Sequence, residues 1–372
     1  MKKFLLFLLA FVALFALVAC SKTDDGDDKE KETAEIAVVT DIGQLRDGGF
    51  NEGTYTGVEN YAKANNKTYA YYQPKNGNAA TDNDRIAAME QAIENGAKII
   101  VTPGFLQYDA LSTVAKNNPD VKFIFVDGWN FGEANVTAIS YKEEESGFLA
   151  GYAAVKDGYT KLGGTFGGGG ANAACNRFCL GYVQGAQAAA KELNKVVDVK
   201  VSFQYGSGFS ASPELQAQMS AWYQSGIEVI FSCGGSMLQS VKAAADENGD
   251  VKIIGVDVDQ ANESPKVLTS AVKGLAASVE KVLGEYYDGK WDTLLADKTS
   301  NLGAADNATG LPTADSSWRF STFTKAEYEQ LFQDIVDGKV EISSDIPEKM
   351  DETEYWTVLD LLLLNVSVSL DK

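Results

Sequence analysis

The chain has 372 residues, about twice the ~150 used as a soft prior for one domain, so two domains or lobes are expected. It contains no histidine, which excludes Ser/His/Asp and Cys/His nucleophilic catalysis and any imidazole metal ligand. The formal charge of -20, from 32 Lys and Arg against 52 Asp and Glu, disfavours binding to nucleic-acid phosphates, which requires clustered cations. We expect no nucleic-acid partner.

The N-terminus has the layout of a secretory signal. Two lysines precede sixteen apolar residues, 4–19, a run shorter than the about 20 residues that span a bilayer. The run ends in Leu17-Val18-Ala19-Cys20, which resembles a bacterial lipobox with an acylated cysteine. We therefore expect a signal peptide over 1–19, then a lipidated Cys20 and an acidic tether over 20–35, anchored outside the cytoplasm. An uncleaved anchor with an incidental cysteine is the alternative.

From residue 36 onward, short β-branched runs alternate with Ala-rich helical patterns, which predicts an α/β fold with parallel sheets. The strands are expected at Ile36–Thr40, Lys98–Thr102, Lys122–Val126, Val136–Ser140, Lys161–Phe166, Val197–Phe203, Glu228–Ser232 and Lys252–Val256. The helices are expected at Gly53–Asn65, Thr81–Asn95, Leu106–Asn117, Glu144–Asp157, Gly181–Asn194, Pro213–Ser225, Met237–Asn248 and Lys325–Asp337. The apolar end, 356–370, is too short and too interrupted to span a membrane and is expected to pack as a terminal strand or helix.

The rhythm breaks near 140–154, which favours two doubly wound lobes with a cleft between them over a single (β/α)8 barrel. We expect the first lobe to comprise 36–140 with about 270–292. The second lobe is expected to comprise 141–269 with about 293–372.

Three of the predicted strands end in aspartate, at Asp41, Asp127 and Asp257. Ligands of parallel α/β sheets bind at the carboxyl ends of the strands, so these side chains are candidates for one site. A carboxylate accepts hydrogen bonds from vicinal hydroxyls, which favours a ribose or polyol over an anion. Helix capping or Asx turns would explain each aspartate singly.

Two aromatic residues follow strands in loops rich in small residues. Phe50 and Asn51 come after Gly48-Gly49, and Phe209 comes after Gly206-Ser207-Gly208. A phenyl ring offers a stacking surface and an amide offers a donor and an acceptor, which suits a flat heterocycle. Core packing would equally explain Phe50, and N-capping would explain Asn51.

The remaining motifs indicate neither a metal nor a cofactor. The glycine run 163–170 lacks the Lys-Ser/Thr of a Walker A loop, and the acidic run 246–250 lacks the Gly and Glu of a calcium loop. Cys175, Cys179 and Cys233 have no histidine to complete a metal site and are expected to be small buried residues.

The order of these motifs resembles the basic membrane protein (BMP) lipoproteins, a family of purine nucleoside receptors. The motifs are Thr40-Asp41-Ile42-Gly43, Asp47-Gly48-Gly49-Phe50-Asn51-Glu52-Gly53, Val126-Asp127-Gly128, Ser146-Gly147-Phe148-Leu149-Ala150-Gly151-Tyr152, Gly255-Val256-Asp257-Val258-Asp259-Gln260 and Thr269-Ser270-Ala271-Val272-Lys273. The resemblance covers about 36–290 and implies a type I periplasmic binding protein that serves an ABC importer. The chain departs from the usual pattern at Asp47-Gly48-Gly49 and in its glycine-rich loop 168–172, which leaves the base preference open.

The resemblance also implies roles for individual residues. Phe50 and Phe209 would stack on the two faces of a purine, and Asp41 and Asn51 would bind its edge. The ribose hydroxyls would be held by Asp127, Asp257 and Lys273. Gly234 would allow the ligand to approach the backbone closely.

The resulting hypothesis is a lipid-anchored, monomeric, non-enzymatic receptor that delivers purine nucleosides to an ABC permease. A sugar or polyol receptor of the same fold would share the carboxylates and have less use for two phenyl rings. The sequence is also compatible with a nucleoside hydrolase, although the clustered aspartates of such enzymes usually hold calcium. A surface protein that contacts a host or partner is the third competing hypothesis.

Overall fold

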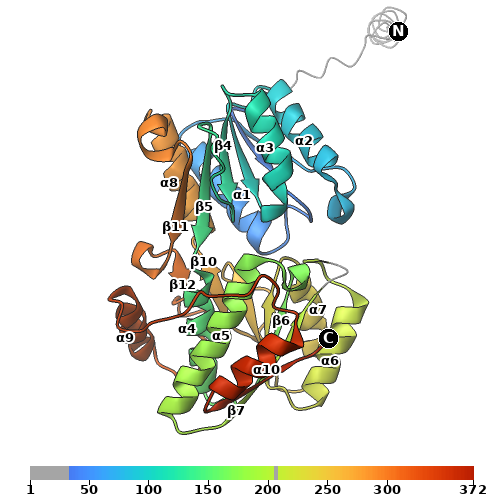
Figure 1. Ribbon diagram of the computed structural model, residues 1–372, viewed down its shortest axis with the longest axis vertical. Helices are drawn as coiled ribbons and strands as arrows, with labels where there is room; N and C mark the ends of the chain where they lie inside the picture. Colours follow the sequence, from blue (N-terminus) through green and yellow to red (C-terminus); the bar gives the residue numbers. More distant parts are fainter. Residues whose placement is uncertain (1–32, 205–207) are drawn as a thin grey trace, which may run out of the picture. The chain divides into compact units, whose positions relative to one another are not determined.

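The computed structural model describes residues 33–204 and 208–372, so the predicted signal peptide, Cys20 and nearly all of the tether lie outside the described residues. The described chain contains two sheets with helices on both faces of each, which confirms the predicted α/β class (Figure 1). Among the described residues, no helix is long and apolar enough to cross a membrane.

The first sheet has the strand order β11-β5-β4-β3-β1-β2, and all its strand pairs are parallel. Its strands are β1 (Ile36–Val39), β2 (Tyr69–Tyr72), β3 (Ile99–Pro103), β4 (Lys122–Val126), β5 (Val136–Tyr141) and β11 (Lys298–Leu302). The helices beside it are α1 (Phe50–Ala64), α2 (Asp82–Glu94), α3 (Tyr108–Asn117) and α8 (Leu275–Tyr287). Ile36 and Val38 pack with α1 and α8, whereas Ala37 and Val39 pack with α2 and α3, as the alternation of side chains along a strand requires.

The second sheet has the strand order β12-β10-β9-β8-β6-β7-β13, with only β12 antiparallel to its neighbour. Its strands are β6 (Lys161–Phe166), β7 (Val197–Phe203), β8 (Val229–Cys233), β9 (Lys252–Asp257), β10 (Val267–Lys273), β12 (Thr309–Gly310) and β13 (Val366–Leu370). The helices of this part are α4 (Glu143–Lys156), α5 (Ala173–Glu192), α6 (Pro213–Gln224), α7 (Met237–Asp246), α9 (Lys325–Val336) and α10 (Thr353–Leu362). We call the first sheet with its helices lobe 1 and the second lobe 2.

The chain passes between the sheets after β5, after β10 and after β11. These crossings follow Tyr141, Lys273 and Leu302, whereas the sequence placed them near 140, 270 and 292. Strand β10 pairs with β9 in lobe 2, and β11 pairs with β5 in lobe 1. The βα rhythm shows where a strand ends but carries no information about which sheet it joins.

All eight strands predicted from the sequence are present, and β2, β10, β11 and β12 are additional to them. Helix α5 begins at Ala173, eight residues before the predicted start, because the Asn172 side chain caps it by accepting from the Cys175 backbone N–H. The C-terminal segment forms both the helix α10 and the strand β13, which pairs with β7. Cys175, Cys179 and Cys233 are buried and free of disulfides, as expected.

Candidate functional site

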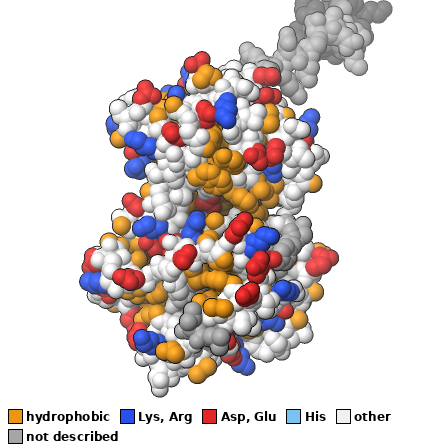
Figure 2. Space-filling view, viewed as in Figure 1, with side chains coloured by type: hydrophobic (Ala, Val, Ile, Leu, Met, Phe, Trp, Pro, Cys, Tyr) orange, Lys and Arg blue, Asp and Glu red, His pale blue; other side chains and the backbone are white. Residues whose placement is uncertain are grey.

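All eight ligand-binding residues predicted from the sequence line one cavity of about 710 Å³ at the carboxyl ends of the strands. They are Asp41, Phe50, Asn51, Asp127, Phe209, Gly234, Asp257 and Lys273. Residues of both lobes line this cavity, and acidic side chains lie beside hydrophobic ones at the waist between the lobes (Figure 2).

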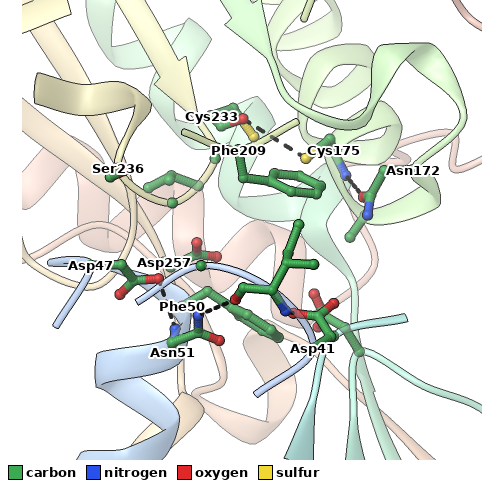
Figure 3. Close-up of a pocket in the computed structure, with 18 of the residues that line it drawn as sticks. Asp41, Asp47, Phe50, Asn51, Asn172, Cys175, Phe209, Cys233, Ser236 and Asp257 are labelled. Atoms are coloured by element: carbon green, nitrogen blue, oxygen red, sulfur yellow. Dashed lines mark hydrogen bonds between the residues drawn. The ribbon is translucent and has the colours of Figure 1, made fainter. Parts of the chain in front are cut away.

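The two predicted aromatic rings lie on opposite sides of the cavity. Phe50 is the first residue of α1 in lobe 1, while Phe209 lies in lobe 2 beside Cys175 and Asn172 (Figure 3). A Cβ on Gly234 would lie 2.9 Å from the Phe209 ring and 3.0 Å from the Met237 sulfur. Gly234 therefore leaves the space that the Phe209 ring occupies, rather than only letting a ligand approach the backbone.

Asp41 lies at the end of β1 and is almost fully buried, with 6% of its surface exposed. Its carboxylate accepts a hydrogen bond from the Ile42 backbone N–H at 2.6 Å. Gly104 has a positive φ of 100°, and a Cβ there would collide with this carboxylate. Burial raises the pKa of Asp41 to about 7, although the Ile42 N–H and the charge of Arg85 act in the opposite direction.

The Asn51 amide has a fixed orientation. Its Nδ2 donates to the backbone carbonyls of Ile42 at 3.1 Å and Gln44 at 3.2 Å, while its buried Oδ1 has no hydrogen-bond partner. Helix α1 begins here because the Asp47 carboxylate accepts from the backbone N–H groups of Gly49, Asn51 and Glu52. Asn51 therefore does not serve as the N-cap, and its oxygen remains a free acceptor at the cavity wall.

Lys273 is the centre of a buried charge cluster. Its Nζ lies 2.6 Å from Asp127 Oδ2, 3.4 Å from Glu143 Oε1 and 3.6 Å from Asp257 Oδ1. Burial alone would lower the pKa of Lys273, but the charges of Asp127, Asp257 and Glu143 outweigh it and raise this pKa well above its usual value. Burial raises the pKa of both Asp127 and Asp257 to about 6, against the opposing charge of Lys273.

The backbone aims two of these carboxylates. Asp127 and Asp257 have φ values of 55° and 68°, in the left-handed region that aspartate tolerates better than most residues. The chain turns sharply at Asp127 after β4 and at Asp257 at the end of β9. Both carboxylates therefore lie against the Lys273 ammonium group. These are the sharp strand-end turns at which the sequence suggested ligand contacts.

Several residues at the site were not predicted from the sequence. Asn172, Cys175 and Phe178 line the cavity from α5 and the residue that caps it, and Glu143 approaches Lys273 from behind. The position of Asn172 after the glycine loop of β6 was an available signal, since it follows a strand end. Glu143 also follows a strand end, two residues after β5, whereas Phe178 carried no such signal because it lies within α5.

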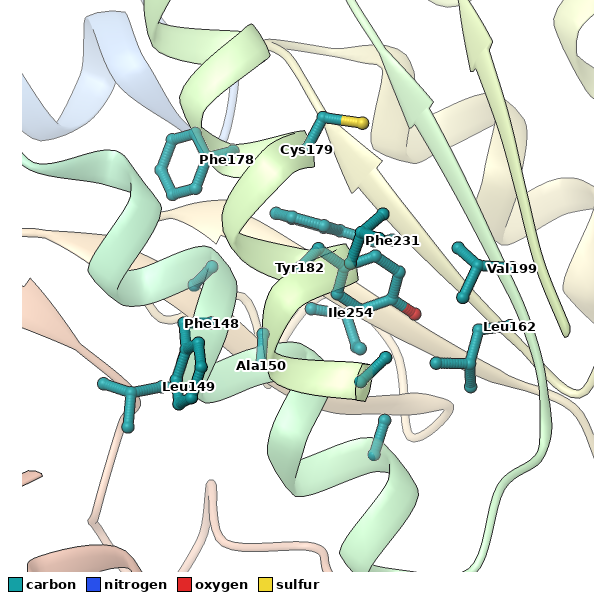
Figure 4. Close-up of a cluster of buried hydrophobic side chains, with 14 of the residues drawn as sticks. Phe148, Leu149, Ala150, Leu162, Phe178, Cys179, Tyr182, Val199, Phe231 and Ile254 are labelled. Carbon is teal, nitrogen blue, oxygen red and sulfur yellow. The ribbon is translucent and has the colours of Figure 1, made fainter. Parts of the chain in front are cut away.

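Close packing of α4 and α5 places Phe178 and Glu143. A Cβ on Gly181 or Gly147 would collide with the backbone of Glu144 or Phe178 on the opposite helix. The two helices therefore touch backbone to backbone, above a core that includes Phe178, Tyr182 and Phe231 (Figure 4). Arg177 on α5 then reaches Glu143 Oε2 with its Nε at 2.6 Å.

The cavity offers two aromatic surfaces and several hydrogen-bond acceptors. Within residues 33–204 and 208–372, no group of three or more His, Cys, Asp or Glu side chains is placed to hold a metal ion. The Lys273 ammonium already faces three carboxylates, so its first effect is to hold those carboxylates in place. Such a site suits a neutral ligand with a flat ring and hydroxyl groups.

Residues 34–345 match the model of the Bmp family, described as ABC transporter substrate-binding protein PnrA-like. The chain belongs to this family. A Bmp-family relative, the ABC transporter nucleoside-binding protein BmpA of Lactococcus lactis subsp. cremoris, is 31% identical over 340 residues, which cover 85% of this chain and 91% of the relative. Basic membrane protein D of Borreliella burgdorferi is 29% identical, covering 85% of this chain and 89% of that protein. The resemblance inferred from the sequence is thereby confirmed.

The fold of this Bmp-family protein is also that of solved ABC solute-binding proteins. The structure of one from Aeropyrum pernix matches with a TM-score of 0.70 at 19% identity, covering 88% of this chain and 96% of that one. One from Conexibacter woesei matches with a TM-score of 0.65 at 18% identity, covering 84% and 100%. The predicted fold of a periplasmic binding protein is therefore confirmed, and the protein is the substrate-binding component of an ABC transporter.

Proposed function

We propose that this protein binds purine nucleosides outside the cytoplasm, held to the membrane by an acyl group on Cys20, and delivers them to the permease of an ABC importer. The observation that carries the proposal is the pair of opposed phenyl rings, Phe50 and Phe209, in a cavity that also contains the carboxylates of Asp127 and Asp257. A nucleoside has one flat apolar part and one part rich in hydroxyls, and the cavity has surfaces for both.

The base would lie between the two rings. Stacking on an aromatic side chain contributes on the order of 1–3 kcal/mol per base, so two rings would supply much of the affinity. The free Oδ1 of Asn51 would accept from an N–H of the base edge, since its Nδ2 is held by two carbonyls. Asp41 would bind the same base, because it also lines the cavity from lobe 1 (Figure 3).

The ribose would lie against the charge cluster. Lys273 Nζ is 5.0 Å from the centroid of the Phe50 ring, so the carboxylates that it holds adjoin the proposed stacking surface. Carboxylates at this position accept hydrogen bonds from the vicinal hydroxyls. They also repel a phosphate, so we expect nucleosides to bind and nucleotides to be rejected.

The relatives support the ligand class. The Lactococcus lactis relative is named a nucleoside-binding protein, and it aligns with most of this chain. The chain also has no histidine that could serve as a general base beside the ligand. We expect binding without catalysis, the role that the name of this relative describes.

Calorimetric titration with a matched panel tests the proposal: inosine, guanosine and adenosine, their free bases, ribose, arabinose and inosine monophosphate. We expect nucleosides to bind more tightly than the free bases, ribose or the nucleotide. Tight binding of a sugar with no binding of any nucleoside would establish the polyol receptor instead. Release of hypoxanthine after prolonged incubation with inosine would establish a nucleoside hydrolase.

A further inference from the structure

The residues just beyond the part of the chain that matches the family model contact the glycine loop Gly167–Gly170, which is next to the cavity-lining residue Phe209. The backbone N–H of Met350 donates to the Gly170 carbonyl at 3.0 Å. Gly170 has a φ of 77°, and a Cβ there would lie 2.7 Å from the Asp351 backbone nitrogen. The segment Met350–Trp356 is thus packed directly onto the glycine loop Gly167–Gly170.

Trp356 holds this segment in place. Its indole is 2% exposed, and its Nε1–H donates to the Met350 carbonyl at 2.6 Å. The ring lies 6.1 Å from that of Phe203 on β7, which in turn lies 5.8 Å from that of Phe166 on β6. Phe166 immediately precedes the glycine loop. The start of the loop is therefore connected to Trp356 through the Phe203 and Phe166 rings, and its end is connected through the hydrogen bond between Gly170 and Met350.

The other face of the same loop supports the Phe209 ring. A Cβ on Gly167 would collide with this ring, and one on Gly168 would lie 3.2 Å from its tip. The Gly168 N–H donates to the Gly208 carbonyl at 3.3 Å, next to Phe209 in the chain. The loop therefore contacts Met350 and Asp351 at Gly170 and the Phe209 ring at Gly167 and Gly168.

We infer that Met350–Trp356 is a positioning element for the binding site, which fixes the loop Gly167–Gly170 and through it the Phe209 ring. The inference rests on the proposed function, because it assigns the segment an effect on base stacking. Glycine loops lose more conformational freedom on ordering than other segments do, so an external support lowers the cost of holding the ring ready for the ligand.

The experiment compares two tryptophan substitutions in the full chain. Trp356→Phe keeps an aromatic ring but removes the N–H that donates to Met350. Trp222→Phe is the matched control: Trp222 is also 2% exposed, its Nε1–H donates to Asp371 Oδ2 at 2.5 Å near the C-terminus, and it does not line the cavity.

We expect the inosine Kd of Trp356→Phe to rise about fivefold, the effect of one lost buried hydrogen bond, while that of Trp222→Phe stays at the starting value. In a Phe209→Ala background, the effect of Trp356→Phe on Kd should disappear, because the segment acts through that ring. An effect of the same size in both backgrounds, or in both tryptophan variants, overturns the inference.

Hydrogen exchange of the ligand-free protein gives a readout that does not depend on the ligand. The amides of Gly167–Gly169 should exchange faster in Trp356→Phe and remain unchanged in Trp222→Phe. Unchanged exchange in Trp356→Phe overturns the inference whatever the protein binds. Faster exchange in a protein that binds no nucleoside would overturn the proposed function and the segment's effect on stacking, but not its effect on the loop.

Discussion

The ammonium group of Lys273 lies 2.6 Å from the Asp127 carboxylate, and this ion pair joins strand β10 of lobe 2 to the end of strand β4 in lobe 1. The Lys273 side chain is only 2% exposed, and Glu143 and Asp257 also face it. Three carboxylates from different parts of the chain therefore face one buried cation at the cavity wall, and Arg177 also pairs with one of them, Glu143.

Lys273→Met should destabilise the protein strongly. Removing one partner of a buried ion pair costs about 3–5 kcal/mol, because the remaining charges stay buried and uncompensated. Urea unfolding near neutral pH should show this loss, with partial recovery in acid, where the carboxylates become protonated. Lys281→Met is the control, since Lys281 pairs with Glu285 at 2.9 Å but is 66% exposed, and we expect about 1 kcal/mol or less. Equal losses would show that the cluster is not the cause.

Phe209→Ala should weaken nucleoside binding by about 1–3 kcal/mol, because one stacking surface is lost. Calorimetry with inosine measures the change in Kd. Trp129→Ala is the control: Trp129 is 45% exposed, stacks on Tyr108 in lobe 1 and does not line the cavity. An unchanged Kd for Phe209→Ala would remove this ring from the binding site.

Gly104→Ala should abolish tight binding, because its Cβ would collide with the Asp41 carboxylate and displace it. The matched control is Gly132→Ala. Gly132 has a similar φ of 88°, and its Cβ would have no atom within 4 Å. Both variants should lose about 1–2 kcal/mol of stability from the positive φ, as denaturant unfolding would show. If Gly132→Ala also lost nucleoside binding, backbone strain rather than the displaced carboxylate would be responsible.

Nucleoside affinity should increase as the pH rises through about 7, the raised pKa of Asp41. A ligand N–H favours the ionised carboxylate, so binding lowers this pKa and releases a proton. In the ligand-free protein the same raised pKa acts in the opposite sense: stability falls as the pH rises from 3.8 to about 7, since the folded state holds the proton more tightly.

Asp41→Asn should remove the step near pH 7 from the calorimetric pH profile. A second change in affinity near pH 6 should remain in this variant, because the pKa values of Asp127 and Asp257 are both raised to about 6. A step near pH 7 that survives in Asp41→Asn would assign it to another group, and Glu144, whose pKa burial raises to about 7, is the one to substitute next.

Cys20→Ser should prevent acylation and release the protein from the membrane fraction, because the Cys20 sulfur is the atom proposed to carry the acyl group. Labelling with a clickable fatty acid and fractionation measure both effects. Ser21→Ala is the matched control and should keep the label. A Cys20→Ser protein that loses the label but stays in the membrane fraction would show that the N-terminal apolar run itself is an anchor, and one that keeps the label would place the acyl group on another residue.

The sequence predicted much of the candidate site because one rule governs it. Asp41, Asp127 and Asp257 each follow an apolar run, and the ends of parallel strands meet at one edge of a sheet. Phe178 could not be predicted in this way. It lies within α5, and only the close packing of α4 against α5 brings it to the cavity.

The sequence by itself determined the α/β class and the positions of most strands, since strands buried on both faces of a parallel sheet are nearly continuous apolar runs. It also determined which side chains stand at the ends of these strands. The tertiary structure decided which sheet β10 and β11 join, which charges surround Lys273, and that the segment Met350–Trp356 supports the Gly167–Gly170 loop. These depend on contacts between residues far apart in the chain, and local sequence patterns carry no information about such contacts.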